Sequence, residues 1–421
     1  MARPSEDMLF AGIDIGSTAV RIVVGQKLPS TDKEQVHIIG AAEVQSEGIN
    51  RGTINSIEDA VSSVSACIEK VERMTGAQLS SAWVAVSGAN VGLLESKGVI
   101  AVSKPDGEIR EEDVERAVDA AQTVATPVNV EIIHVIPKSF TVDQQKGVKD
   151  PVGMNGIRLE VDAQIIHGQS SYLKNLQKCV YRTGVNMERL VVGILAAAET
   201  VASQRQKELG VAVMNVGGAT TTLAVFDQGD LVHMASIPVG SEHVTSDVAI
   251  GLRTSIDTAE RVKLQYANAV AKDVSRGEEV NLQELGGDSE EFVSRKYISE
   301  IVQARLEEIL EKVDKELKKI GRSGLLPAGV ILTGGGAKLP GFVDLAKAKL
   351  RLPVALGYPL GVSSITDRVN DLAFTTAIGL VQWGIDETPD TSKRRGGAIS
   401  NFKPVEKVTA HIKKWFGGMA P

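Results

Sequence analysis

Cysteine is scarce in this sequence of 421 residues. Only Cys67 and Cys179 are present, and they stand more than a hundred positions apart. Two such residues give neither a disulfide framework nor the paired spacing of a zinc site. We therefore expect both to be reduced and structural, in a fold held together by apolar side chains, which make up 43% of the residues.

Long apolar segments are also missing. No run approaches the roughly 18 uninterrupted apolar residues of a membrane-spanning helix. The first residues lack the basic start and the apolar stretch of a signal peptide. We expect a cytoplasmic protein whose contact with a membrane is peripheral.

An excess of positive charge is absent as well. The net charge of -7 argues against a nucleic-acid partner, because proteins that bind nucleic acid usually present a basic face. The charge is uneven along the chain, since residues 393–416 hold seven Lys or Arg and one acid. A small basic tail thus follows an acidic body.

The length and one repeated pattern predict the fold class. Single cores stop growing near roughly 250–300 residues, so more than one lobe is expected. Residues 9–15 and 19–24 read as two strands joined by a tight turn, and residues 211–216 and 222–226 repeat this arrangement about 200 positions later. The repetition predicts an internally duplicated α/β fold.

The turns of these two hairpins are candidate phosphate loops. Glycine lets the backbone approach phosphate oxygens, and hydroxyl groups can donate to them. The predicted phosphate-binding residues are Gly16, Ser17 and Thr18 in the first turn, and Gly217, Gly218, Ala219 and Thr220 in the second. Each turn alone is also typical of an ordinary hairpin. Facing each other, the two would clamp one polyphosphate, with Asp14 holding hydrated Mg²⁺ and Asn215 reaching it through water.

Two more segments extend this candidate site. Residues 333–337 read TGGGA between an expected strand at 329–333 and an expected helix at 339–350. In another expected helix, Glu260 and Lys263 are three positions apart and share a face, which alone is also typical of a surface salt bridge.

Together and in this order, the four segments resemble the nucleotide motifs of the actin, heat-shock chaperone and hexokinase superfamily. The resemblance implies ATP as the ligand, with Glu260 and Lys263 contacting the ribose and adenine. Gly334, Gly335 and Gly336 would then border the nucleoside.

Within that superfamily, the chain resembles the FtsA family of bacterial cell-division proteins. Residues 134–137, 150–159, 47–52 and 238–247 carry this resemblance, which runs from about position 9 to 383. It implies an actin-like, two-lobed fold around a nucleotide cleft. The implied divisions are subdomain 1A (8–81, 166–199 and 363–385), an inserted 1C (82–165), 2A (200–245 and 323–362) and 2B (246–322).

The second phosphate loop departs from the usual superfamily pattern. Asn215 and Thr222 stand where carboxylates are common, and Ala219 replaces a glycine. Gly193 stands where bacterial actins that hydrolyse ATP carry a glutamate. Since phosphoryl transfer depends on positioning and on charge neutralisation, we expect slow or absent ATP hydrolysis. No catalytic residue is assigned.

The end of the chain predicts a membrane contact. Residues 386–403 read as a flexible linker, rich in Pro, Ser, Gly and charge. Residues 404–416 have the spacing of an amphipathic helix, and a helix docked on the protein's own core is the other interpretation. The residues expected to meet anionic lipid are Val405, Val408, Ile412, Lys413, Lys414, Trp415 and Phe416.

The resemblance also implies partners. FtsA proteins form actin-like filaments, bind the C-terminal peptide of the tubulin homologue FtsZ through 2B, and meet other divisome proteins. Arg295, Lys296 and Arg305 lie in the matching region and could receive an acidic peptide, although a solvated charged face is the simpler interpretation. The expected location is the cytoplasmic side of the cell membrane at the division site.

A scaffold of type IV pilus assembly, resembling PilM, remains an alternative, because it shares the fold. A heat-shock chaperone would need a further domain, and a sugar kinase would need a sugar-binding signature. We expect no second chaperone domain after Trp383, and the sequence shows no sugar-binding signature.

Overall fold

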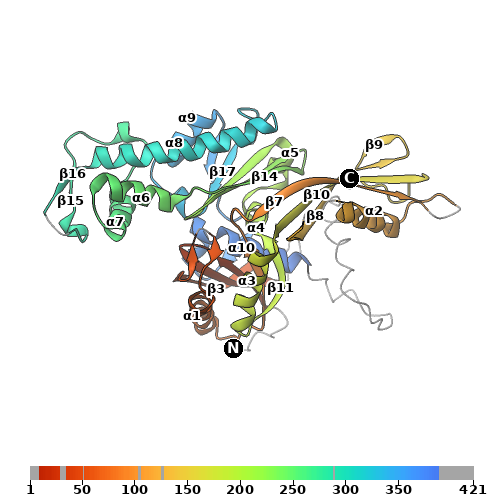
Figure 1. Cartoon of the computed structure of the whole chain (residues 1–421), viewed down its shortest axis with the longest axis horizontal. Coiled ribbons are helices and arrows are strands. Elements are labelled where there is room, and N and C mark those ends of the chain that lie inside the picture. The colour runs from red at the N-terminus through yellow and green to blue at the C-terminus, as the bar shows by residue number, and fades with distance from the viewer. Residues whose placement is uncertain are drawn as a thin grey trace. The chain divides into compact units, whose positions relative to one another are not determined.

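The computed structural model describes residues 9–28, 35–50, 52–102, 106–124, 128–287 and 290–387. The chain divides into two compact units (Figure 1). One unit joins the residues up to Asn90 with Asn175–Gln382, and the other is built around Val91–Lys174. The second unit is therefore an insertion in the sequence of the first.

The first unit begins with a six-stranded sheet in the order β11-β6-β1-β2-β3-β19. Strands β1, β2 and β3 form an antiparallel meander. Strand β6 pairs with β1 in parallel, and β11 pairs with β6 in parallel. The strands are β1 (Leu9–Ile15), β2 (Ala19–Leu28), β3 (Gln35–Gln45), β6 (Ser81–Val86), β11 (Asn186–Val192) and β19 (Val362–Ser364).

A five-stranded sheet repeats this plan in the order β14-β13-β12-β17-β18. Again the three strands that come first in the chain, β12, β13 and β14, form an antiparallel meander. Strand β17 pairs with β12 in parallel, and β18 pairs with β17 in parallel. The strands are β12 (Val211–Val216), β13 (Thr221–Asp227), β14 (Asp230–Ile237), β17 (Val330–Thr333) and β18 (Val354–Leu356). The duplicated α/β architecture predicted from the two hairpins is confirmed.

Helices cover both sheets. Around the first lie α1 (Ile57–Thr75), α3 (Ser170–Arg182), α4 (Gly193–Val201) and α10 (Thr375–Glu387). With the second go α5 (Gln204–Leu209), α6 (Ser241–Leu252), α7 (Ile256–Tyr266), α8 (Arg295–Lys319) and α9 (Phe342–Leu350). Short strand pairs complete the unit: β4 (Ile49–Asn50) with β5 (Thr53–Ile54), and β15 (Glu279–Asn281) with β16 (Phe292–Ser294).

Helix α8 carries an apolar stripe along one face. Ile298, Val302, Leu306, Ile309, Val313 and Leu317 are fully buried, and they join one core with strands of the second sheet and with α6 and α9. Figure 1 shows α8 and α9 together beside β17. This packing fixes α8 along most of its length, while its polar side chains stay at the surface.

The insertion has its own sheet and core. Strands β7 (Val91–Ala101), β10 (Arg158–Gln169), β8 (Val130–Val142) and β9 (Gln145–Val148) lie in this order, and α2 (Glu111–Val124) packs on the sheet. Phe140, Leu159 and Val161 are fully buried in this core.

The folded insertion is shifted from the predicted limits of 82–165. Strand β6 pairs with β1 and β11, so Ser81–Val86 belongs to the first sheet. Strand β10 pairs with β7 and β8 as far as Gly168 and Gln169, so it belongs to the insertion. Both shifts arise because strand pairing, which the sequence does not reveal directly, decides the membership of each strand.

Both cysteines are free and buried, as predicted. Burial raises the pKa of Cys67 to about 12 and that of Cys179 to about 11, so both stay protonated at neutral pH. Across the described ranges, no helix has the length and apolar character needed to cross a bilayer.

The end of α10 corrects the start of the predicted linker. The helix continues to Glu387, so the first two residues of the predicted linker 386–403 are helical. The rest of that linker and the predicted amphipathic helix at 404–416 lie outside the described residues.

Candidate functional site

The two candidate phosphate loops have the same backbone closure. In the β1–β2 turn, the Gly16 N–H donates to the Ala19 carbonyl at 3.1 Å. In the β12–β13 turn, the Gly217 N–H donates to the Thr220 carbonyl at 2.9 Å. The second loop is thus a structural copy of the first.

Neighbouring groups hold the first loop in place. The Ser46 hydroxyl donates to the Gly16 carbonyl at 2.7 Å, and the Ser17 hydroxyl accepts from the Gly52 N–H at the same distance. In the second loop, Gly218 approaches its surroundings closely, since a Cβ there would overlap the Thr18 hydroxyl. The loops therefore meet at their tips.

A cavity of about 450 Å³ opens between the loops, and the residues of the predicted site line it. It lies wholly within the first unit. Every residue predicted for phosphate, nucleoside or metal contact lines it: Asp14, Gly16, Ser17, Thr18, Asn215, Gly217, Gly218, Ala219, Thr220, Glu260, Lys263, Gly334, Gly335 and Gly336.

Asp14 and Asn215 occupy equivalent places, each next to last in the first strand of its sheet. Burial raises the pKa of Asp14, and Arg21, its cross-strand partner on β2, acts in the opposite direction. The Asn215 side-chain amide donates to the Thr376 hydroxyl at 3.2 Å. One position thus offers a carboxylate and its copy offers an uncharged amide.

Glu260 and Lys263 form more than a surface salt bridge. Lys263 is 4% exposed, and its ammonium lies 2.6 Å from the Glu260 carboxylate. Both side chains also bond the Thr245 hydroxyl on α6, at 2.8 Å from Lys263 and 2.5 Å from Glu260. The pair therefore forms a fixed polar edge of the cavity.

The glycine cluster after β17 allows close backbone packing. Gly334 has φ of +87°, and a Cβ there would overlap the Asn215 side chain and the Val216 carbonyl. The positive φ and the close contacts each exclude a side chain at position 334. Gly335, by contrast, faces open space.

Comparison with known proteins supports the interpretation of the motifs. A family model described as "Cell division protein FtsA" matches residues 212–379, and a model described as "SHS2 domain inserted in FTSA" matches residues 88–167. FtsA of Pseudomonas aeruginosa is 34% identical over 99% of this chain and 100% of its own length. FtsA of Bacillus subtilis is 38% identical over 96% of this chain and 88% of its own length.

This chain belongs to the FtsA family of cell-division proteins. Its FtsA relatives include that of Escherichia coli K12, at 30% identity over 99% of this chain and the whole of the other. The family assignment sets aside the pilus scaffold, the alternative that the sequence left open.

Solved structures confirm the actin-like fold. The PilM-PilN type IV pilus biogenesis complex matches with a TM-score of 0.65 at 15% identity, covering 89% of this chain and 98% of that one. MreB5 of Spiroplasma citri bound to ADP matches with a TM-score of 0.53 at 14% identity, covering 93% and 100%. In this FtsA-family chain the insertion described above is the SHS2 domain, the predicted 1C.

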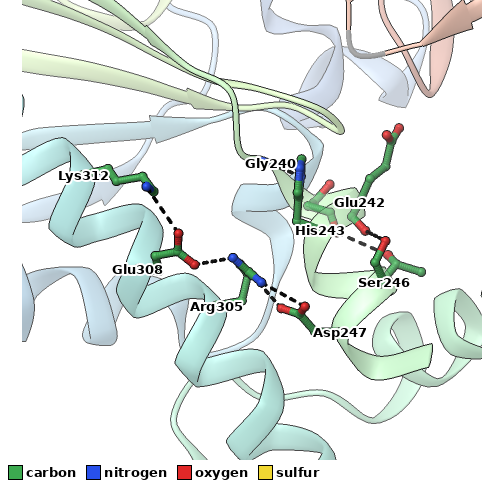
Figure 2. A network of polar contacts seen from close by, with 10 residues as sticks. Gly240, Glu242, His243, Ser246, Asp247, Arg305, Glu308 and Lys312 are labelled. Atoms are coloured by element: carbon green, nitrogen blue, oxygen red, sulfur yellow. Dashed lines mark hydrogen bonds and ion pairs between the residues drawn. The ribbon is translucent and has the colours of Figure 1, made fainter. Parts of the chain in front are cut away.

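The predicted peptide-binding residues lie on α8 and do not line the cavity. Figure 2 shows Arg305 reaching Asp247 on α6, with Glu308 and Lys312 further along α8. Arg305 lies 2.5 Å and 2.9 Å from the two Asp247 oxygens and also pairs with Glu308. At the start of α8, Arg295 pairs with Glu278 at 2.5 Å, and Lys296 is half-buried.

Sequence reasoning missed several polar residues of the cavity. Arg21 could have been found, because a tight turn at 16–18 sets residue 21 opposite Asp14. Glu43 then follows from the next hairpin, where it pairs with Arg21 at 2.6 Å. Ser87, Lys338 and Thr376 carry no local signal, since only the tertiary fold brings them to the cavity.

Proposed function

We propose that this chain binds ATP with Mg²⁺ and links FtsZ filaments to the cytoplasmic membrane at the division site. The observation that carries the proposal is the pair of loops with identical closure, facing each other across one cavity. Two such turns suit a polyphosphate, because each offers backbone N–H groups and hydroxyls without intervening side chains.

The residues present fit this ligand. Thr18 and Thr220 place hydroxyls at the loop tips, and the Glu260–Lys263 pair offers an acceptor and a donor for a ribose or base. Gly335, which faces open space, leaves room for a flat ring beside the backbone of Gly334 and Gly336. Asp14 would hold the hydrated cation, which would neutralise phosphate charge, and Asn215 would contact its water.

Slow or absent hydrolysis is part of the proposal. Asn215, Ala219 and Thr222 supply no carboxylate from within the second loop, so none of these three side chains can act as a general base. A Cβ added at Gly193 would overlap the Ser87 hydroxyl. Ser87 thus fills the space from which a longer side chain at position 193 would reach the cavity, and its hydroxyl is a poor base.

The C-terminal peptide of FtsZ is the proposed partner of the α6–α8 surface. Arg295, Lys296 and Arg305 supply positive charge there, and Tyr297 and Ile250 are 45% and 76% exposed. The end of α6 abuts α8, since a Cβ at Gly251 would lie 3.8 Å from the Tyr297 hydroxyl. Charge beside exposed apolar side chains suits a short acidic peptide with apolar anchors.

Membrane attachment would come from residues 404–416 on the linker 386–403. A helix this short binds weakly alone, so self-association into actin-like filaments would supply avidity. The insertion, which has its own sheet and core, is the proposed contact for other divisome proteins. The division of the first unit into 1A, 2A and 2B stays a prediction.

Isothermal titration with MgATP, MgADP and MgGTP tests the nucleotide proposal. We expect binding of both adenine nucleotides and its loss in Gly218→Val, whose side chain would occupy the contact between the loop tips. Glu300→Gln, on the exposed side of α8, is the folded control. Absence of ATP binding by the native chain would contradict the proposal.

A further inference from the structure

Glu242 lies between the tips of the two phosphate loops. Its backbone N–H, in the first turn of α6, donates to the Gly218 carbonyl at 2.8 Å. Its carboxylate accepts a hydrogen bond from the Thr18 hydroxyl, also at 2.8 Å. One residue therefore bonds the second loop through its backbone and the first loop through its side chain.

The carboxylate rests directly against the second loop. A Cβ on Gly218 would lie 2.5 Å from a Glu242 carboxylate oxygen, as well as overlapping the Thr18 hydroxyl. In Figure 2 the Glu242 side chain points away from the Arg305 cluster, on the other side of α6. Its charge is thus directed at the loops and away from α8.

Glu242 differs from the other glutamates near the cavity in its electrostatic surroundings. Glu43 pairs with Arg21, and Glu260 pairs with Lys263. Within the described part of the chain, no cationic side chain lies within ion-pair distance of Glu242, and its side-chain partner is the neutral Thr18 hydroxyl. Its carboxylate therefore has no ion-pair partner where the loops meet.

We propose that Glu242 determines phosphate specificity: it disfavours a nucleoside triphosphate relative to a diphosphate unless a divalent cation accompanies the ligand. This inference rests on the proposed function. With the nucleoside held by Glu260, Lys263 and the glycine cluster, each added phosphate brings more negative charge to the loop tips. There it meets the Glu242 carboxylate, and like charges a few ångströms apart repel strongly near a protein surface.

The same arrangement explains why a cation would restore binding. A divalent ion on the phosphates cancels the charge that Glu242 repels. The Thr18 hydroxyl can then donate to phosphate in place of the carboxylate. Because of Glu242, the affinity of the site therefore depends on the charge of the ligand as well as on its shape.

Glu242→Gln tests the proposal, because the amide oxygen can still accept from Thr18 while the charge is lost. The dissociation constants of ATP and ADP are measured by calorimetry, with Mg²⁺ and with EDTA. In EDTA the native chain should bind ATP more weakly than ADP, and we call the ratio of the ATP to the ADP dissociation constant the gap. Glu242→Gln should lower this ratio about tenfold. With Mg²⁺ the two proteins should differ little. An unchanged gap in EDTA would overturn the proposal.

Two further measurements separate charge from hydrogen bonding. Thr18→Val removes the bond to Glu242 and keeps the charge, so all nucleotides should weaken together and the gap in EDTA should persist. If Thr18→Val narrows the gap as Glu242→Gln does, the charge account is wrong. In the native chain, added salt should narrow the gap by screening, and a gap insensitive to salt would contradict the proposal without any variant.

The control is Glu300→Gln, which removes one exposed carboxylate from α8 and should leave the gap unchanged. Failure of the proposed function is distinguishable from failure of this inference. If the native chain binds neither nucleotide with Mg²⁺, the nucleotide site itself is refuted. If it binds both and Glu242→Gln behaves like the native chain in EDTA, only the role of Glu242 is refuted.

Discussion

Arg305 on α8 and Asp247 on α6 are joined by two hydrogen bonds of 2.5 Å and 2.9 Å. The Asp247 hydrogen bond raises the pKa of Arg305 still further, so the guanidinium stays charged throughout the accessible pH range. The pair fixes the plane of the guanidinium at the surface. A charged group held in one orientation loses less entropy when it binds a further carboxylate.

Arg305→Ala is expected to weaken binding of an FtsZ C-terminal peptide by about tenfold or more, the loss typical of one charged anchor residue. Lys312→Ala is the matched control, because Lys312 lies two turns further along α8 and pairs with Glu308. Fluorescence anisotropy of a labelled peptide measures both affinities. Equal losses in the two variants would indicate a general charge effect and contradict a specific role for Arg305.

Asp14 is expected to lower the stability of the empty protein at neutral pH. Burial raises its pKa in the folded chain above the unfolded value. The folded state therefore binds the proton more readily, and this group's contribution to the free energy of unfolding falls as pH rises through the folded pKa. Asp14→Asn should raise that free energy by about 1 kcal/mol at neutral pH, with the gain shrinking as pH falls. Urea unfolding at neutral and acidic pH measures it, and a variant less stable than the native chain at neutral pH contradicts it.

Asp14→Asn should also weaken Mg²⁺-dependent nucleotide binding.

Much of the predicted site could be found from the sequence because phosphate loops need particular small residues, and these stand together in the chain. Gly16–Thr18 and Gly217–Thr220 were both recognisable as hairpin turns, and both line the cavity. Local chemistry was enough to find them.

Other features depend on pairing between distant segments. Glu242 bonds Thr18 across 224 positions. Thr376 reaches Asn215 across 161 positions. The shifted limits of the insertion have the same origin, since β6 joins the first sheet through partners on either side. The residues of a strand do not by themselves show which other strands it pairs with.

Lys263→Met should destabilise the protein and abolish nucleotide binding. The change leaves the Glu260 carboxylate and the Thr245 hydroxyl without their buried cation. We expect a loss of about 2 kcal/mol in the free energy of unfolding, because a buried polar group loses its charged partner. Chemical denaturation measures it, with Lys296→Met on α8 as control. A native-like stability would indicate that the pair is not structurally coupled to α6.

Asn215→Asp should restore a carboxylate at the second loop. The new side chain would accept from the Thr376 hydroxyl where the amide now donates. We expect ATP turnover to rise above the native rate by about tenfold, since a carboxylate organises the cation. Phosphate release measures turnover, and Asn215→Ser is the control without charge. Equal rates in the native chain and in Asn215→Asp would contradict the proposal that the missing carboxylate limits hydrolysis.

Flotation of FtsZ filaments with anionic vesicles tests the central claim most directly. Labelled FtsZ is mixed with vesicles, MgATP and either the full chain or a chain that ends at Glu387, the last residue of α10. The account predicts that FtsZ floats with the vesicles only when the full chain is present, and that Arg305→Ala lowers the floated fraction. If FtsZ floats equally well with the shortened chain, or stays in solution with the full one, the chain is not the link between filament and membrane.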